Sequence, residues 1–140
     1  MAQQPLFDAF SMSGNEPQHT KQILIVDDDI SIRHMLGRVL SDEGYGVISA
    51  ASGEEGLKLA EGGGVDLVLL DLKMPGIGGQ ETFRLMQRTR PDLPVIIISA
   101  YSRQQFAELA GARALLQKPL DFPVLLDTIK SILSQPVALG

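Results

Sequence analysis

Four short apolar runs in this chain of 140 residues each end in side chains suited to phosphoryl or metal chemistry. These side chains are Asp27, Asp28, Asp29, Asp71, Ser99 and Lys118. Carboxylates that lie close together repel one another, and one of them takes up a proton unless a cation intervenes. A hard divalent ion such as Mg²⁺ removes this repulsion, because it binds carboxylates together with waters and phosphate oxygens. A lysine ammonium and a serine hydroxyl add two donors for phosphoryl oxygens, so the set has the composition of a phosphoryl-transfer site.

Each of these residues also has an ordinary structural explanation when it is taken alone. An Asp after a strand commonly caps the next helix, and Asp29 is a candidate for that role. Ser99 would be a small residue at a strand end, and Lys118 would be a solvated cation. Asp66 is expected to be a solvated acid at the start of a strand. The joint pattern favours the functional interpretation, because ligand sites of open parallel sheets lie at the carboxyl ends of the strands.

The apolar runs predict the strands that position these residues. Three runs are nearly continuous in Val, Ile and Leu, as expected for parallel strands that are buried on both faces. These three are Ile23–Val26, Val65–Leu70 and Val95–Ile98, and two weaker candidates are Tyr45–Ala50 and Ala114–Gln117.

Segments with helical periodicity alternate with the runs. An apolar stripe runs from Ile32 to Leu40, and Ser52-Gly53-Glu54-Glu55 matches a capping box that opens a helix to about Glu61. Further helices are predicted before Pro91, over Arg103–Ala110, and after the candidate N-cap Asp121. This alternation predicts βαβ units, and therefore a parallel sheet with helices on both faces.

Composition excludes several classes of protein. The chain has no cysteine, which excludes a disulfide scaffold, a zinc knuckle and a thiol nucleophile. The net charge of −5 argues against direct nucleic-acid binding, which needs a basic face. No apolar run approaches the roughly 18 residues that a membrane span needs, so we expect a cytoplasmic protein without a membrane contact.

The chain divides into three parts of different composition. Residues 1–21 are polar and are predicted to form a disordered leader, with Leu6–Phe10 as a docking segment in the alternative interpretation. Residues 22–134 are predicted to form one folded domain, and residues 135–140 a short tail.

The motifs at the ends of the apolar runs resemble those of the receiver domain of two-component response regulators. The resemblance rests on ILIVDDD at 23–29, LLDLKMPG at 69–76, IISA at 97–100 and Lys118-Pro119, and it covers about residues 22–134. It implies a doubly wound, five-stranded parallel sheet of flavodoxin-like order. It also implies a signalling phosphoacceptor rather than an enzyme, with a sensor histidine kinase or phosphotransfer protein as the donor and an unidentified protein as the downstream target.

The resemblance assigns a role to each residue that matches a motif. Asp71 is the implied phosphoacceptor, Ser99 the switch hydroxyl and Lys118 the phosphoryl clamp, with a cis bond expected at Lys118-Pro119. The implied Mg²⁺ ligands are Asp28 directly, Asp27 through water, Asp71, and the backbone carbonyl of Lys73.

Two features depart from the family pattern. Leu115 stands where receivers usually carry Tyr or Phe, three residues before the clamp lysine. The interval from Ser99 to Lys118 is short by roughly one helical turn of 3–4 residues, so the fourth helix is expected to be shortened.

Lys73 and Tyr101 follow the phosphoacceptor and the switch hydroxyl by two positions each, and we predict that this pair partly shields the phosphorylated site from water.

Two alternative functions remain open from the sequence. A small phosphohydrolase of the haloacid-dehalogenase type also begins with a strand and Asp-x-Asp, and Asp27-x-Asp29-x-Ser31 fits that pattern. That interpretation leaves Asp71 and the following Met-Pro-Gly unexplained. The other alternative is a receiver-like interaction module that does not accept phosphate.

Overall fold

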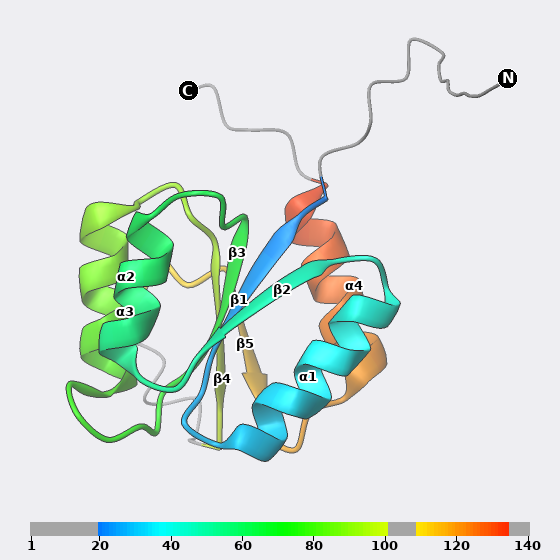
Figure 1. Cartoon of the computed structure of the whole chain (residues 1–140), viewed down its shortest axis with the longest axis horizontal. Helices are drawn as coiled ribbons and strands as arrows, with labels where there is room; N and C mark the ends of the chain where they lie inside the picture. Colours follow the sequence, from blue (N-terminus) through cyan, green and yellow to red (C-terminus); the bar gives the residue numbers. More distant parts are fainter. Residues whose placement is uncertain (1–19, 101–108, 135–140) are drawn as a thin grey trace, which may run out of the picture.

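A five-stranded parallel sheet forms the centre of the molecule (Figure 1). The computed structural model describes residues 20–100 and 109–134. In their order across the sheet, the strands are β2 (Gly46–Ala50), β1 (Gln22–Val26), β3 (Leu67–Asp71), β4 (Val95–Ser99) and β5 (Ala114–Gln117). The predicted fold class is confirmed, since the strand order reverses direction after β1 as it does in a doubly wound sheet.

The position of each strand explains how strongly its sequence signals it. The three continuous apolar runs form the central strands β1, β3 and β4, whose residues are almost all buried. The two weaker runs form the edge strands β2 and β5, which are only partly covered. A strand between two helical layers needs apolar side chains on both faces, whereas an edge strand does not.

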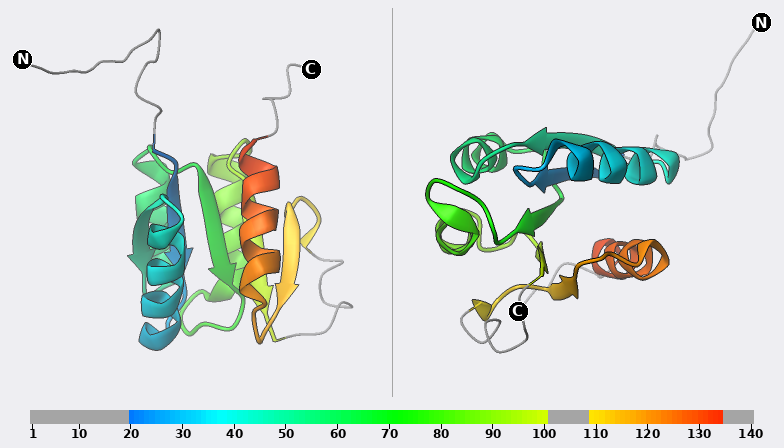
Figure 2. Two further views of the ribbon diagram at one scale, coloured as in Figure 1. Left: turned by 90° about the vertical axis from the view of Figure 1, so that its right-hand side faces the viewer. Right: turned by 90° about the horizontal axis from the view of Figure 1, so that it is seen from below.

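Four described helices cover the two faces of the sheet. They are α1 (Ile30–Asp42), α2 (Gly53–Glu61), α3 (Gly78–Thr89) and α4 (Phe122–Leu133). Figure 1 shows α2 and α3 on one side of the sheet and α1 and α4 on the other, and in the left view of Figure 2 the latter pair lies in front of the strands. None of the helices in residues 20–100 and 109–134 is long and apolar enough to cross a membrane.

Alternation along each strand divides the core between the two layers. Leu24 and Val26 of β1 belong to the cluster that contains Met86 of α3, whereas Ile23 belongs to the cluster that contains Leu36 of α1. Successive side chains of a strand point to opposite faces, so one apolar run serves both layers. This packing fixes the plane of the sheet and therefore the positions of the residues that follow each strand.

Local capping signals are confirmed where the structure describes them. Ser52 caps α2 by accepting a hydrogen bond from the Glu55 amide at 3.1 Å. In return, Glu55 Oε1 accepts from the Ala51 amide at 2.9 Å, which is one residue before the amide that the standard capping box uses. Asp121 caps α4 by accepting from the Val124 amide at 3.1 Å.

Asp66, predicted to be a solvated acid at the start of a strand, directly precedes β3 and is half-buried, and it has a structural role that the sequence did not indicate. Its carboxylate Oδ2 accepts a hydrogen bond from the backbone amide of Gln22 at 2.8 Å, so it ties the start of β1 to the chain before β3. The predicted helix over Arg103–Ala110 lies largely outside the described residues, as do most of the leader and the tail.

Candidate functional site

The pairing of β1 with β3 brings two acidic strand ends together. Val26 is aligned with Leu70 in this parallel ladder, so Asp27 and Asp71 are the next residues on neighbouring strands. Both are buried, with 2% and 5% of their surface exposed. Asp28, on the turn that follows β1, is exposed, and one carboxylate oxygen from each of the three residues lies within 4.8 Å of the other two.

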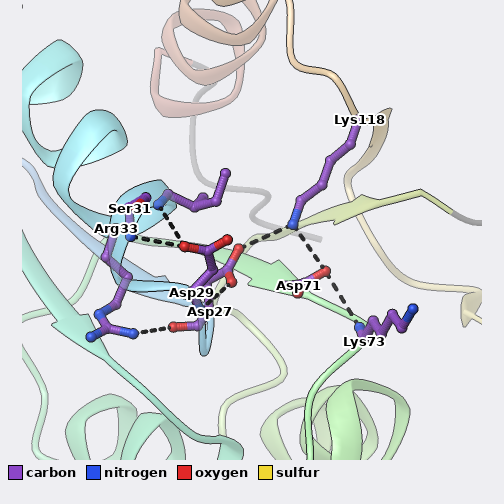
Figure 3. Close-up of polar contacts among 8 residues, drawn as sticks. Asp27, Asp29, Ser31, Arg33, Asp71, Lys73 and Lys118 are labelled. Atoms are coloured by element: carbon purple, nitrogen blue, oxygen red, sulfur yellow. Dashed lines mark hydrogen bonds and ion pairs between the residues drawn. The ribbon is translucent and has the colours of Figure 1, made fainter.

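The ammonium of Lys118 faces both buried carboxylates (Figure 3). Its Nζ lies 3.3 Å from Asp27 Oδ2 and 3.5 Å from Asp71 Oδ1. The backbone of Lys118 directly follows β5, and its amide donates to the carbonyl of Ser99 at 2.9 Å, which places it beside the end of β4. The Lys118-Pro119 bond is cis, as the resemblance implied.

Burial and a neighbouring negative charge act together on Asp71. Removal from water raises the pKa of this carboxyl group, and the charge of Asp27 raises it further. The ammonium of Lys118 and a hydrogen bond of 3.3 Å from the Lys73 amide act in the opposite direction, but the balance is a raised pKa. Three carboxylates against one ammonium leave an excess of negative charge, which fits a divalent cation.

The donor set also agrees with Mg²⁺ in its chemistry. All three converging side chains offer carboxylate oxygen, and the described cluster contains no histidine or thiol. Mg²⁺ prefers oxygen ligands and usually keeps several waters, so the exposure of Asp28 to solvent suits it.

Asp29 lies beside the cluster but has a structural role. Its Oδ1 accepts from the backbone amides of Ser31 at 2.8 Å and Ile32 at 3.4 Å, which makes it the N-cap of α1. Its own amide donates to Asp27 Oδ1 at 2.9 Å and thereby orients the buried carboxylate. The phosphohydrolase alternative requires Asp29 as a reactive group and is not favoured, since this carboxylate caps the helix.

The site opens into a pocket of about 500 Å³ at the carboxyl edge of the sheet. Its walls are Asp27, Asp28, Asp29, Asp71, Lys73, Met74, Pro75, Ala100 and Lys118. Ser99 is fully buried. In the described part of the wall, its neighbour Ala100 lines the pocket and Ser99 does not. A space of this size admits a phosphoryl group and hydrated metal.

The close approach of α3 supports the end of β3. A Cβ atom built on Gly79 would meet the backbone oxygen of Asp71 at 2.5 Å, and the Gly79 amide donates to the carbonyl of Leu72 at 3.1 Å. The helix backbone therefore rests directly on the segment that carries the Asp71 side chain. Only a residue without a side chain fits at this contact.

The structure thus brings together four of the residues named from the sequence. Asp27, Asp28, Asp71 and Lys118 form one cluster, and Lys73 joins it through its backbone amide. Leu115 packs against the core cluster on the α2–α3 side of the sheet. Tyr101 lies outside the described residues, so the predicted shielding by Lys73 and Tyr101 stays a prediction.

Two residues with a part in the site were not found from the sequence. Gly79 contributes to the site because α3 packs closely on the end of β3. Arg33 contributes because the first turn of α1 brings its guanidinium to the turn after β1. Arg33 Nη1 donates to the carbonyl of Asp27 at 2.7 Å (Figure 3). Its position six residues after Asp27, on the helix that the turn opens, is the only signal the sequence carries.

Comparison with known proteins identifies the same region. The family model of the response regulator receiver domain matches residues 23–130. The transcriptional regulatory protein GlrR of Escherichia coli is 38% identical over 124 residues, which is 86% of this chain but 27% of GlrR. Sporulation initiation phosphotransferase F of Bacillus subtilis is 38% identical over 117 residues, which is 81% of this chain and 94% of that protein.

A solved structure extends the similarity to three dimensions. The response regulator protein TrrA of Thermotoga maritima, in complex with Mg(2+)-BeF, has a TM-score of 0.76 and 36% identity over 81% of this chain and 99% of that chain. TrrA is also known in complex with the histidine kinase ThkA, with a TM-score of 0.76, 37% identity, and coverage of 82% of this chain and 100% of that chain. The present chain belongs to the family of response regulator receiver domains, the phosphoacceptor domains of two-component signalling.

Proposed function

We propose that Asp71 accepts a phosphoryl group from a phosphohistidine on a sensor histidine kinase or phosphotransfer protein. The observation that carries the proposal is the position of the Asp71 carboxylate, which has the Lys118 ammonium at 3.5 Å and two further carboxylates within 4.8 Å. A carboxylate that faces a pocket beside a cation site and an ammonium is placed to attack phosphorus.

The transfer exchanges one bond to phosphorus for another. A carboxylate oxygen of Asp71 attacks the phosphorus atom, and a P–O bond forms. The P–N bond to the donor imidazole breaks, and its electron pair remains on the departing nitrogen. Lys118 stays within reach of the phosphoryl oxygens and offsets their charge, and Asp27 keeps the ammonium directed into the site.

A bound Mg²⁺ would offset the negative charge of the phosphoryl oxygens and of the carboxylates around them. The residues that would hold it are Asp27, Asp28 and Asp71, with the backbone carbonyl of Lys73 as a further ligand. Their carboxylate oxygens already converge, which supports this assignment.

Phosphorylation would act as a switch through its charge. It adds about −1.5 to −2 charge and three acceptor oxygens to a site that already carries excess negative charge. Ser99, buried at the end of β4 beside the pocket residue Ala100, would donate its hydroxyl to one of those oxygens and draw the following segment inward. A protein target that binds the two conformations with different affinity would read the change. On this account the domain is a signalling phosphoacceptor without enzymatic turnover.

Beryllofluoride, a phosphoryl analogue, tests the proposal with little risk of side reactions. We expect that beryllofluoride with Mg²⁺ shifts the backbone amide resonances of the pocket residues in the ¹⁵N spectrum of the wild-type chain. The variant Asp71→Asn should show none of these shifts. Asp127→Asn, an exposed change of the same type on α4, should respond like the wild type.

Two results would contradict the proposal. An unchanged wild-type spectrum would favour the interaction module that does not accept phosphate. Sustained hydrolysis of a generic phosphate ester by the wild-type chain, with loss in Asp71→Asn, would indicate an enzyme instead.

A further inference from the structure

Arg33 makes a charged hydrogen bond to the turn that carries two of the three acidic residues. It lies in the first turn of α1, is half-buried, and donates from Nη1 to the backbone carbonyl of Asp27 at 2.7 Å (Figure 3). Hydrogen bonds from a charged donor are roughly twice as strong as bonds between neutral groups. The contact therefore holds this carbonyl firmly in place.

The Arg33 contact completes the set of partners around Asp27. The Asp27 amide donates to the carbonyl of Ala50 at 3.1 Å, and its two carboxylate oxygens accept from the Asp29 amide and from Lys118 Nζ. The carbonyl was the remaining polar group, and Arg33 satisfies it. Asp27 is thus fixed at every polar atom.

The carbonyl that Arg33 holds belongs to the peptide bond between Asp27 and Asp28. Because a peptide unit is planar, fixing its oxygen also fixes the plane in which the Asp28 nitrogen and Cα lie. In the described part of the chain, no protein donor contacts the Asp28 carboxylate, which is exposed. Among the described residues, only the backbone and the side chain's own rotamer therefore orient Asp28 toward Asp27 and Asp71, and Arg33 anchors that backbone.

We propose that Arg33 is a positioning residue for the cation site: its guanidinium holds the Asp27–Asp28 peptide so that the exposed Asp28 carboxylate converges with the two buried ones. The inference rests on the proposed Mg²⁺ site and adds to it a residue that does not touch the ion. Groups that orient metal ligands from behind typically change metal affinity by roughly 10–100-fold when they are removed.

The proposal predicts a change opposite in sign to the simple electrostatic effect of Arg33. A positive charge near a cation site repels Mg²⁺, so removal of the charge alone would strengthen binding. Loss of positioning would weaken it. The sign of the change in affinity therefore separates the two effects.

The experiment measures Mg²⁺ affinity by titrating the chain of residues 1–140 with MgCl₂ at constant ionic strength and following ¹⁵N amide shifts. Arg33→Met removes the charge and the donor while keeping most of the side-chain length, and Arg33→Lys keeps the charge and one donor group. Arg38→Met is the matched control, because Arg38 is exposed on the same helix and makes no polar contact with the described residues. Thermal unfolding confirms that each variant is folded before it is titrated.

We expect Arg33→Met to bind Mg²⁺ about tenfold more weakly than the wild type, in line with lost ligand orientation. Arg33→Lys should recover most of that loss, and Arg38→Met should stay within about twofold of the wild type because its charge is screened by solvent. Unchanged or tighter binding by Arg33→Met would overturn the role of Arg33 and leave the proposed function intact. A wild-type chain that does not bind Mg²⁺ would overturn the metal site itself.

Discussion

The acidic cluster combines groups that repel one another in the absence of a cation. Asp27 and Asp71 are both buried, and one ammonium serves the two of them. This arrangement raises the pKa of Asp71, first through desolvation and then through the charge of Asp27. The ionised form of Asp71 therefore lowers the stability of the cation-free domain.

The pH dependence of stability tests this electrostatic account. When the pKa of a group is higher in the folded than in the unfolded chain, the group's contribution to the free energy of unfolding is fully present below the unfolded pKa. That contribution is lost as the pH rises through the folded pKa. Asp71→Asn cannot ionise, so without divalent cations it should be more stable than the wild type at pH 7. This difference should disappear when the pH falls below the ordinary pKa of an aspartate.

Urea unfolding of both chains in chelator across this pH range measures the difference. Asp127→Asn serves as the control, because Asp127 is exposed and its replacement should show no such trend. A gain in stability for Asp71→Asn that does not depend on pH would contradict the account, as would a loss of stability at pH 7.

The sequence identified the residues of the cluster because of where they stand along the chain. Asp27, Asp71 and Lys118 follow or end apolar runs, and parallel strands bring such ends to one edge. The roles of Arg33 and Asp66 could not be predicted in the same way. Each depends on a hydrogen bond to the backbone of β1 or the turn that follows it, which only the folded chain brings into reach.

At the scale of elements, the contact between α3 and β3 determines where Asp71 lies. Gly79 allows the helix backbone to approach the carbonyl of Asp71, and the same helix buries Phe83 and Met86 against the sheet. A side chain at position 79 would force either the helix or the strand end to move. Gly37 of α1 provides a contrast, because a Cβ built there would meet Val47 Cγ1 at 3.9 Å, which is an ordinary van der Waals distance.

A pair of Gly→Ala substitutions tests the importance of this close contact. Gly79→Ala should lower the free energy of unfolding by about 1–3 kcal/mol, the usual cost of overpacking. Gly37→Ala should raise it by about 0.5–1 kcal/mol, because alanine is the better helix former and has room. Chemical denaturation of the wild type and the two variants measures both effects. A Gly79→Ala variant as stable as the wild type would show that close contact between the α3 backbone and the end of β3 is not required for stability.

Sequence periodicity predicted the elements but not all of their limits. The apolar run Val65–Leu70 predicted a strand over those residues, whereas β3 begins at Leu67 and ends at Asp71. The start of α3 at Gly78 has no side-chain cap, since Ile77 occupies the N-cap position, so the sequence gives little indication of where this helix begins. The helix starts there because its backbone packs on the end of β3, which is a tertiary cause.

At the scale of the whole molecule, cation binding and folding are linked. The three carboxylates converge only in the folded chain, so Mg²⁺ should bind the folded state far better than the unfolded one. At a concentration 100 times its Kd, it should add about 2.7 kcal/mol to the free energy of unfolding. Asp28→Ala should lose most of this gain and change the cation-free stability little, because Asp28 is exposed.

Unfolding curves with MgCl₂ and with chelator give this difference for both chains. Equal stabilisation of the wild type and Asp28→Ala would show that the ion acts elsewhere or as a general salt. Stabilisation of the wild type but not of Asp28→Ala would assign the effect to the acidic cluster.

The central claim is that Asp71 receives a phosphoryl group, and intact mass spectrometry tests it most directly. The chain is incubated with Mg²⁺ and a small phosphodonor, its mass is measured, and the modified peptide is located. We expect the wild type to gain one phosphoryl group, located on the peptide that contains Asp71, and Asp71→Asn to gain none. A wild-type chain that gains no mass, or an Asp71→Asn chain that gains the same mass, would contradict it.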